Sequence, residues 1–227
     1  MWHGFVGLKM FNHCPPKELF DFKRENVNGK RHYVTPDGKF PSITSVLSAF
    51  PKPELYEWRR RVGEDEANRI TRTSASRGTS FHTICETYLN NEEVDRTKFK
   101  HDALESFYSV KKFLNRINNI HQIEIPLYSK KLQVAGTCDT IAEFDGELSI
   151  IDYKSSRREK TEDDIIDYFI QTTFYGLSYA EMTGLKAKKI VIIMAVDDGF
   201  SKIFVKDLKD YVKPTVEKIY QYKKLYS

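Results

Sequence analysis

The dipeptide Asp145-Gly146 constrains the fold most, because it favours a two-residue β-turn and stands between two runs with a period of two residues. These runs, at about 133–144 and 147–154, predict the two strands of a hairpin. A type I′ turn at this dipeptide fixes the register and sets Asp139 directly opposite Asp152. The sequence therefore predicts two carboxylates that face each other at the far end of a hairpin.

Two opposed carboxylates destabilise a hairpin unless positive charge lies near them. Lys154 shares a strand face with Asp152 and lies roughly 6.6 Å further along the strand. Carboxylate oxygens also suit hard divalent cations such as Mg²⁺ and Mn²⁺. The spacing alone leaves two interpretations open: a divalent-metal site, or a buried ion-pair cluster in which Lys154 neutralises one carboxylate.

Helical periodicity and strand alternation divide the rest of the chain. We predict helices at 42–50, 54–62, 64–90 (interrupted near Gly78), 101–117, 164–182 (closed by Gly184) and 208–225. We predict further strands from His121, with Ile123, Ile125 and Leu127 on one face, at 190–196 and at 202–205, and small hairpins at Asn28-Gly29 and Asp37-Gly38. The fold class is α/β, with a mixed central β-sheet flanked by helices and a helical N-terminal half, in a single domain over residues 1–227.

Composition limits the class of protein. With 30% charged residues and Ile190–Val196 as the longest uncharged apolar stretch, we expect a soluble chain with no membrane partner. Cys14, Cys85 and Cys138 are an odd number at wide separations, which argues against a disulfide framework and for a reducing compartment. No export or organelle targeting sequence is visible. We therefore expect the protein to be located in the cytoplasm of a bacterium or phage-infected cell, with a mitochondrial location left open. A net charge of +4 permits a nucleic-acid partner without requiring one.

Four motifs occur in an informative order. They are Arg77-Gly78-Thr79-Ser80-Phe81-His82, Gly136-Thr137-Cys138-Asp139, Ile151-Asp152-Tyr153-Lys154 and Gln171-Thr172-Thr173-Phe174-Tyr175. Together they resemble the RecB-like branch of the PD-(D/E)XK nuclease superfamily. Within that branch the chain is similar, over about 41–184, to the mitochondrial genome maintenance exonucleases and their phage and bacterial relatives.

The resemblance implies a restriction-endonuclease-like fold, with a helical portion at about 41–117 and a catalytic core at about 77–206. It assigns catalysis to Asp139, Asp152 and Lys154, and it assigns Mg²⁺ or Mn²⁺ to ligands from His82, Asp139 and Asp152. Substrate binding falls to Gln171, Tyr175 and Arg77. Glu86, one helical turn beyond His82, and Glu124, on the preceding strand, are weaker candidates.

Each assignment has a simpler alternative. A lone helix histidine such as His82 is more often packed or solvated than a metal ligand, and Glu86 could belong to a solvated face. Tyr175 could belong to an aromatic cluster with Phe169, Phe174 and Tyr179. The basic run Arg59-Arg60-Arg61 could contact phosphates or simply be solvated, and Trp58 could stack on bases or pack in a core.

The resulting hypothesis is a Mg²⁺-dependent exonuclease that hydrolyses DNA from single-stranded ends in replication, repair or recombination, and that acts as a monomer. Several RecB-like nucleases bind an iron–sulfur cluster through four cysteines, three of which lie near the C-terminus. This sequence has no cysteine after Cys138, so we predict no such cluster. One alternative is a flap or structure-specific endonuclease of the same superfamily, which would cut closed circles. Another is a nuclease-derived module that binds DNA without cutting it, although Asp139, Asp152 and Lys154 are all present.

Overall fold

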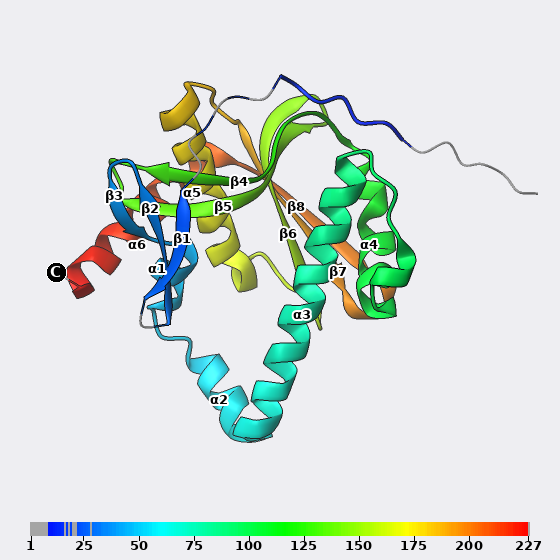
Figure 1. Cartoon of the computed structure of the whole chain (residues 1–227). Coiled ribbons are helices and arrows are strands. Elements are labelled where there is room, and N and C mark those ends of the chain that lie inside the picture. Colours follow the sequence, from blue (N-terminus) through cyan, green and yellow to red (C-terminus); the bar gives the residue numbers. More distant parts are fainter. Residues whose placement is uncertain (1–8, 16, 18, 20–21, 28, 227) are drawn as a thin grey trace, which may run out of the picture.

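The computed structural model describes residues 9–15, 17, 19, 22–27 and 29–226, and its centre is a five-stranded sheet (Figure 1). The strand order is β4-β5-β6-β7-β8. The strands are β4 (Ile117–Ser129), β5 (Val134–Phe144), β6 (Glu147–Ser156), β7 (Lys189–Val196) and β8 (Ser201–Asp207). Only the β6–β7 pair in this sheet is parallel, so the predicted mixed sheet is confirmed.

Helices cover both faces of the sheet. They are α1 (Ile43–Ser48), α2 (Pro53–Val62), α3 (Glu64–Leu89), α4 (His101–Leu114), α5 (Ile166–Thr183) and α6 (Leu208–Tyr226), with short 3-10 turns at Arg96–Lys98, Asp163–Ile165 and Asp197–Gly199. One apolar core joins the sheet to α1, α5 and α6, and a second joins it to α3 and α4. The predicted helices and the left-handed Gly184 cap of α5 are confirmed, with ends shifted by a few residues.

The predicted interruption of α3 at Gly78 is wrong, because the helix continues through this residue. A methyl group at Gly78 would make an ordinary van der Waals contact, at 3.7 Å, with the Ser155 hydroxyl, so the helix lies beside β6 at this residue. This arrangement brings the second half of α3 to the end of the hairpin on which the two carboxylates were predicted.

The predicted hairpin register is confirmed from Phe144↔Glu147 to Thr140↔Ile151, where the ladder stops. Asp139 and Asp152 therefore do not form a ladder pair. Instead, the Asp139 carboxylate accepts a hydrogen bond from the backbone N–H of Tyr153 at 2.8 Å. The side chain thus fills the space where the two strands separate.

Strand β4 does not keep the predicted alternation. Glu124 has a φ of 48°, in the left-handed region, and this conformation breaks the period of two residues. As a result, Ile123 packs on the α3–α4 side of the sheet, whereas Ile125 and Leu127 pack on the α5 side. Strands β4 and β5 bend strongly over their length (Figure 1).

A second, antiparallel sheet precedes α1. It consists of β1 (Lys23–Val27), β2 (Lys30–Thr35) and β3 (Gly38–Pro41), so two small hairpins are present as predicted. Asn28, part of the first predicted turn, lies outside the described residues. The sheet docks on the large one through an apolar cluster of Phe22, Tyr33, Phe40, Tyr128 and Ala135.

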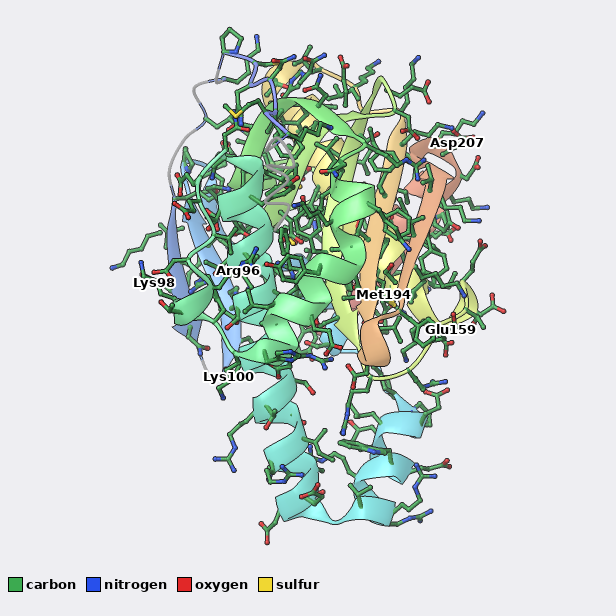
Figure 2. All side chains as sticks on the ribbon, turned by 90° about the vertical axis from the view of Figure 1, so that its right-hand side faces the viewer. Arg96, Lys98, Lys100, Glu159, Met194 and Asp207 are labelled. Atoms are coloured by element: carbon green, nitrogen blue, oxygen red, sulfur yellow. The ribbon has the colours of Figure 1, made fainter. Side chains whose placement is uncertain are left out.

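Helix α2 and the first half of α3 project away from the two sheets as a helical hairpin (Figures 1 and 2). The two helices meet at Gly63, whose φ of 85° allows the sharp corner. Helix α2 buries none of its residues. Over the described part of the chain, no helix has the length and apolar character needed to cross a membrane.

Candidate active site

Seven of the nine predicted site residues line one cleft of about 620 Å³; Asp152 and Arg77 do not. Its walls come from the small sheet, α1, the second half of α3, the bend of β4 and β5, the end of β6, and α5. The chemically active residues on these walls include His82, Glu86, Glu124, Asp139, Lys154, Gln171 and Tyr175. These seven residues come from five elements, α3, β4, β5, β6 and α5, so the fold brings distant parts of the chain to one concave surface.

Asp139 and Asp152 differ in how their charges are compensated. Asp139 accepts from Tyr153 N–H and lies 3.4 Å, at Oδ2, from Nδ1 of His82. Asp152 is 1% exposed, and its Oδ1 has no hydrogen-bond partner. Its other oxygen, Oδ2, pairs with Lys154, whose Nζ lies 2.5 Å away. Asp152 is thus a buried carboxylate with unused lone pairs.

Three ligand atoms, one each from His82, Glu124 and Asp139, lie within 4.8 Å of one another. Each comes from a different element, α3, β4 and β5. Glu124, a member of this group, has a left-handed backbone conformation. Strained backbone of this kind concentrates at functional sites. The weak candidate Glu124 therefore lies closer to the centre of the cluster than the sequence indicated.

Burial and charge shift the pKa values of these groups in different directions. Burial alone would lower the pKa of His82, but the Asp139 carboxylate beside it raises that pKa to about 9. Burial raises the pKa of Asp152 to about 6, against the opposing effect of Lys154. Desolvation and the Asp139 carboxylate raise the pKa of Glu124 to about 7. For Lys154, two carboxylates outweigh burial and raise the pKa.

The protein class follows from a match to a family model. The model described as the PD-(D/E)XK nuclease superfamily matches residues 92–216, more than half of the chain. The chain belongs to the PD-(D/E)XK nuclease superfamily. Its five-stranded mixed sheet between helices is consistent with the restriction-endonuclease-like fold of this superfamily, so the fold class and the recognised family are both confirmed.

Several curated relatives carry the name mitochondrial genome maintenance exonuclease 1. The mouse protein is 26% identical over 162 residues (64% of this chain, 48% of its own), and the human protein is 29% identical over 144 residues (59% and 40%). The Xenopus tropicalis protein is 25% identical over 198 residues (81% and 56%). The chain spans about half the length of these relatives.

PD-(D/E)XK nucleases use divalent metals, and the donors in the cleft fit such an ion. His82, Glu124 and Asp139 offer two oxygens and one nitrogen at mutual distances that one ion could bridge. Asp152, outside that group of three, adds a buried oxygen, Oδ1, that makes no hydrogen bond. A carboxylate left in this condition is costly without a cation, and Lys154 supplies only part of the compensation.

Gln171 and Tyr175 lie one turn apart on α5 and contact each other, with Gln171 Nε2 donating to the Tyr175 hydroxyl at 3.0 Å. The Tyr175 ring packs in the core beside Phe174, while the residue also lines the cleft. The packing in an aromatic cluster is therefore present, and substrate binding by Tyr175 stays a prediction. A methyl group on Gly136 would come within 2.8 Å of the Tyr175 ring, so this glycine leaves room for it.

Arg77 lies apart from the cleft. Its guanidinium pairs with Asp197, beyond β7, and it lines a smaller cavity with Arg69 and Arg157. Glu86 lines the main cleft, and its charge contributes to the raised pKa of Glu124; its role as a weaker site candidate stays a prediction.

The sequence analysis missed the contribution of the small sheet. Arg24 of β1 and Arg31 and Tyr33 of β2 also line the cleft. The sequence of this segment predicts a hairpin. It does not predict where the hairpin docks, because roughly a hundred residues separate the hairpin from Asp139. Predicting these cleft residues would have required knowing which part of the large sheet the hairpin contacts.

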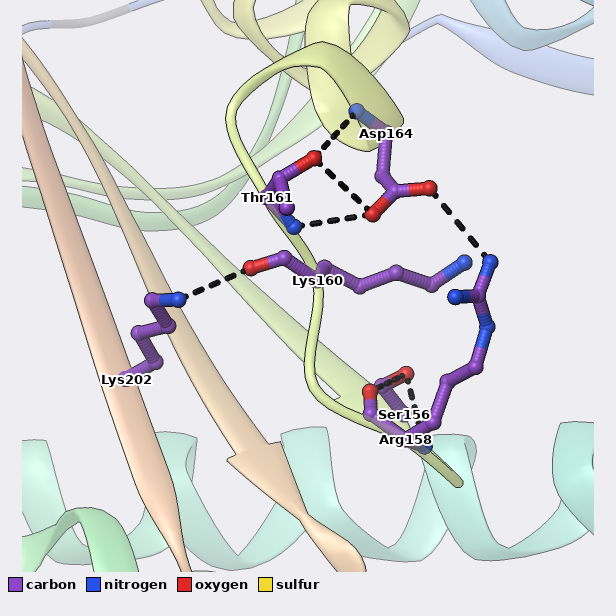
Figure 3. Close-up of polar contacts among 6 residues, drawn as sticks. All are labelled: Ser156, Arg158, Lys160, Thr161, Asp164 and Lys202. Atoms are coloured by element: carbon purple, nitrogen blue, oxygen red, sulfur yellow. Dashed lines mark hydrogen bonds and ion pairs between the residues drawn. The ribbon is translucent and has the colours of Figure 1, made fainter.

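A second cleft of about 800 Å³ lies between α2 and the loop that follows β6. It is lined by Trp58, Leu55, Glu54 and Glu57, and by four cations, Arg60, Arg61, Arg158 and Lys160. The loop is held by Asp164, which accepts from Thr161 and pairs with Arg158, and by Lys202, which donates to the Lys160 carbonyl at 3.0 Å (Figure 3). This basic loop starts only a few residues beyond Lys154.

Proposed function

We propose that the chain is a divalent-metal-dependent deoxyribonuclease that degrades single-stranded DNA from its ends. The observation that carries the proposal is the buried Asp152 carboxylate, whose Oδ1 makes no hydrogen bond, beside the group of His82, Glu124 and Asp139. Within a nuclease superfamily, such a donor set at the base of a cleft supports metal-assisted phosphodiester hydrolysis.

In this mechanism Asp139, Asp152 and His82 would hold one or two Mg²⁺ ions, and Glu124 would join them. A bound Mg²⁺ ion would polarise a phosphate oxygen and lower the pKa of a coordinated water. Lys154 lies in the cleft as a cation, held by Asp152, where it can orient the attacking water and offset charge that develops on the phosphate. Asp139 orients the imidazole of His82.

Two features support a single strand as substrate. Gln171 and Tyr175 present an amide and a hydroxyl at one point of the cleft, where both can contact one nucleotide. The second cleft pairs Trp58 with four cations, a combination that stacks unpaired bases and follows a phosphate backbone. We further propose that the protein is a monomer and acts in DNA replication, repair or recombination in a reducing compartment.

The test is an incubation of linear single-stranded, linear double-stranded and circular single-stranded DNA, with Mg²⁺ or with EDTA, followed by sizing of the products. We expect short fragments and mononucleotides from linear single strands, only with Mg²⁺, and an intact circle. Asp152→Ala and Lys154→Ala should each reduce this activity by roughly 10³-fold or more, with unchanged circular dichroism.

Thr83→Ala is the matched control, because Thr83 lines the cleft and its hydroxyl bonds only within its own helix. Cutting of the circle would favour the endonuclease alternative. DNA binding without cleavage under every condition would favour the binding module. Undiminished cleavage by Asp152→Ala or Lys154→Ala would remove the proposed site.

A further inference from the structure

The two faces of the small sheet carry different charge. On the outer face, Lys23 and Lys39 lie beside Glu25, with Lys39 Nζ 2.7 Å and Lys23 Nζ 4.0 Å from its carboxylate. On the cleft face, the strand register places Arg24 opposite Tyr33 and Arg31 opposite Asn26. Among the ion pairs formed by residues the structure describes, none includes either arginine. The cleft face thus presents two cations without an acidic neighbour.

The backbone of Arg31 is fixed, although its side chain is exposed. Its N–H donates to Ser45 Oγ at 3.1 Å, and its carbonyl accepts from Ser42 N–H at 2.9 Å and from Ser45 Oγ at 3.2 Å. These bonds attach β2 to the start of α1. An arginine held at its Cα while its guanidinium remains in the cleft loses less freedom when it binds a ligand than one on a mobile loop.

The small sheet is also attached directly to the catalytic strand. The Tyr33 hydroxyl lies 3.0 Å from Thr137 Oγ1, two residues before Asp139 on β5. Tyr33 itself is buried, and its ring packs against Phe22. The face that carries Arg24 and Arg31 is therefore positioned against the metal-binding group by packing and by a hydrogen bond.

Charge is unevenly distributed across the cleft. The carboxylates of Glu86, Glu124 and Asp139 come from α3, β4 and β5, whereas the two guanidinium groups come from the small sheet. The carboxylates suit a metal ion, and the guanidinium groups suit anions with planar, bidentate geometry, such as phosphate. A polynucleotide backbone satisfies both sets of groups at once, because its phosphates repeat along the strand.

We propose that Arg24 and Arg31 form a phosphate clamp that binds the backbone of the substrate strand beside the scissile phosphate. The clamp makes the small sheet a functional wall of the active site. It rests on the proposed nuclease function for its biological meaning, but it predicts DNA binding that can be measured without cleavage.

The first experiment measures binding of a fluorescent single-stranded oligonucleotide in EDTA, as a function of salt. For single strands, each phosphate contact contributes about 0.7 to the slope of log Kd against log salt concentration. We expect Arg24→Ala and Arg31→Ala each to weaken binding about ten-fold and to reduce the slope by about 0.7. Arg31→Lys should retain the slope. Lys23 lies on the same strand as Arg24 but on the outer face, so Lys23→Ala should bind the oligonucleotide as the wild type does.

The second experiment compares cleavage of the oligonucleotide with cleavage of the p-nitrophenyl ester of thymidine 5′-monophosphate, which has a single phosphodiester and no flanking phosphate. The arginine variants should lose about ten-fold in kcat/KM on the oligonucleotide and be unchanged on the small ester. Equal losses on both substrates would indicate distortion of the metal site and would overturn the clamp.

The outcomes separate the clamp from the nuclease. Arginine variants that bind like Lys23→Ala, or a wild-type protein that binds no DNA in EDTA, would overturn the clamp even if the protein cleaves DNA. A wild-type protein that cleaves neither substrate, but whose salt slope falls in the arginine variants, would refute the nuclease proposal and leave the clamp in place.

Discussion

The two halves of α3 have the same backbone conformation but different surroundings. Residues 64–76 bury only Ala67, and the ion pairs Arg59–Glu64 and Glu66–Arg69 lie on their surface. Residues 77–89 bury Phe81, Ile84, Cys85, Tyr88 and Leu89 in the second core. One continuous helix thus passes from solvent into the interior of the protein.

The difference explains where the chemistry lies. His82 is held between the apolar contacts of the buried half and the Asp139 carboxylate, so its position is determined by the core. The projecting half depends on helix propensity, surface ion pairs and contact with α2, all of which are weak. We therefore expect substitutions in the buried half to alter the stability of the protein and the geometry of the metal site. Substitutions in the projecting half should have little effect on either.

The largest expected effect concerns stability. Ile84→Ala should lower the free energy of unfolding by about 2–5 kcal/mol, because it leaves a cavity in the second core. Ile70→Ala, the same substitution in the projecting half, should cost less than about 1 kcal/mol, because Ile70 is partly exposed. Urea unfolding followed by circular dichroism measures both. Equal losses would show that the two halves are stabilised alike.

A smaller effect concerns the metal. His82→Ala should weaken Mn²⁺ binding and reduce cleavage at fixed Mg²⁺ by roughly 10²-fold, while its circular dichroism spectrum stays that of the folded wild type. Thr73→Ala, on the projecting half, should change neither quantity. Normal Mn²⁺ titration of His82→Ala would exclude the imidazole as a ligand.

The smallest effect concerns pH in the absence of metal. Since the pKa of His82 is raised from 6.5 to about 9, its interaction with Asp139 stabilises the folded state fully below pH 6.5. This contribution is lost as the pH rises through about 9. In EDTA, the stability difference between wild type and His82→Asn should therefore shrink over this range, by on the order of 1 kcal/mol. A difference that stays constant with pH would contradict the assigned ion pair.

The order of elements and the hairpin register followed from the sequence, because turn dipeptides and apolar periods are local signals. The interruption predicted at Gly78 was wrong, since a single glycine costs a helix only about 1 kcal/mol relative to alanine and does not by itself end it. The alternation along β4 was wrong at Glu124, because a single left-handed residue reverses the face of every residue after it.

For the candidate site, the motifs identified residues that the fold brings to one cleft, including His82, Asp139 and Lys154. The sequence did not place Arg77 beside Asp197, since that pair joins segments far apart in the chain. It also gave Glu124 too little weight, because the bend that directs this carboxylate depends on tertiary structure. The roles of all these residues stay predictions for the experiments above.

The continuity of α3 has a mechanical consequence. With a rise of about 1.5 Å per residue, the segment 64–76 forms an arm roughly 20 Å long beyond its anchored end. A tilt of roughly 5° at the anchor would swing the Gly63 corner by roughly 2 Å. The arm acts as a lever, so a load applied at its tip is transmitted as torque to the turn of helix that carries His82.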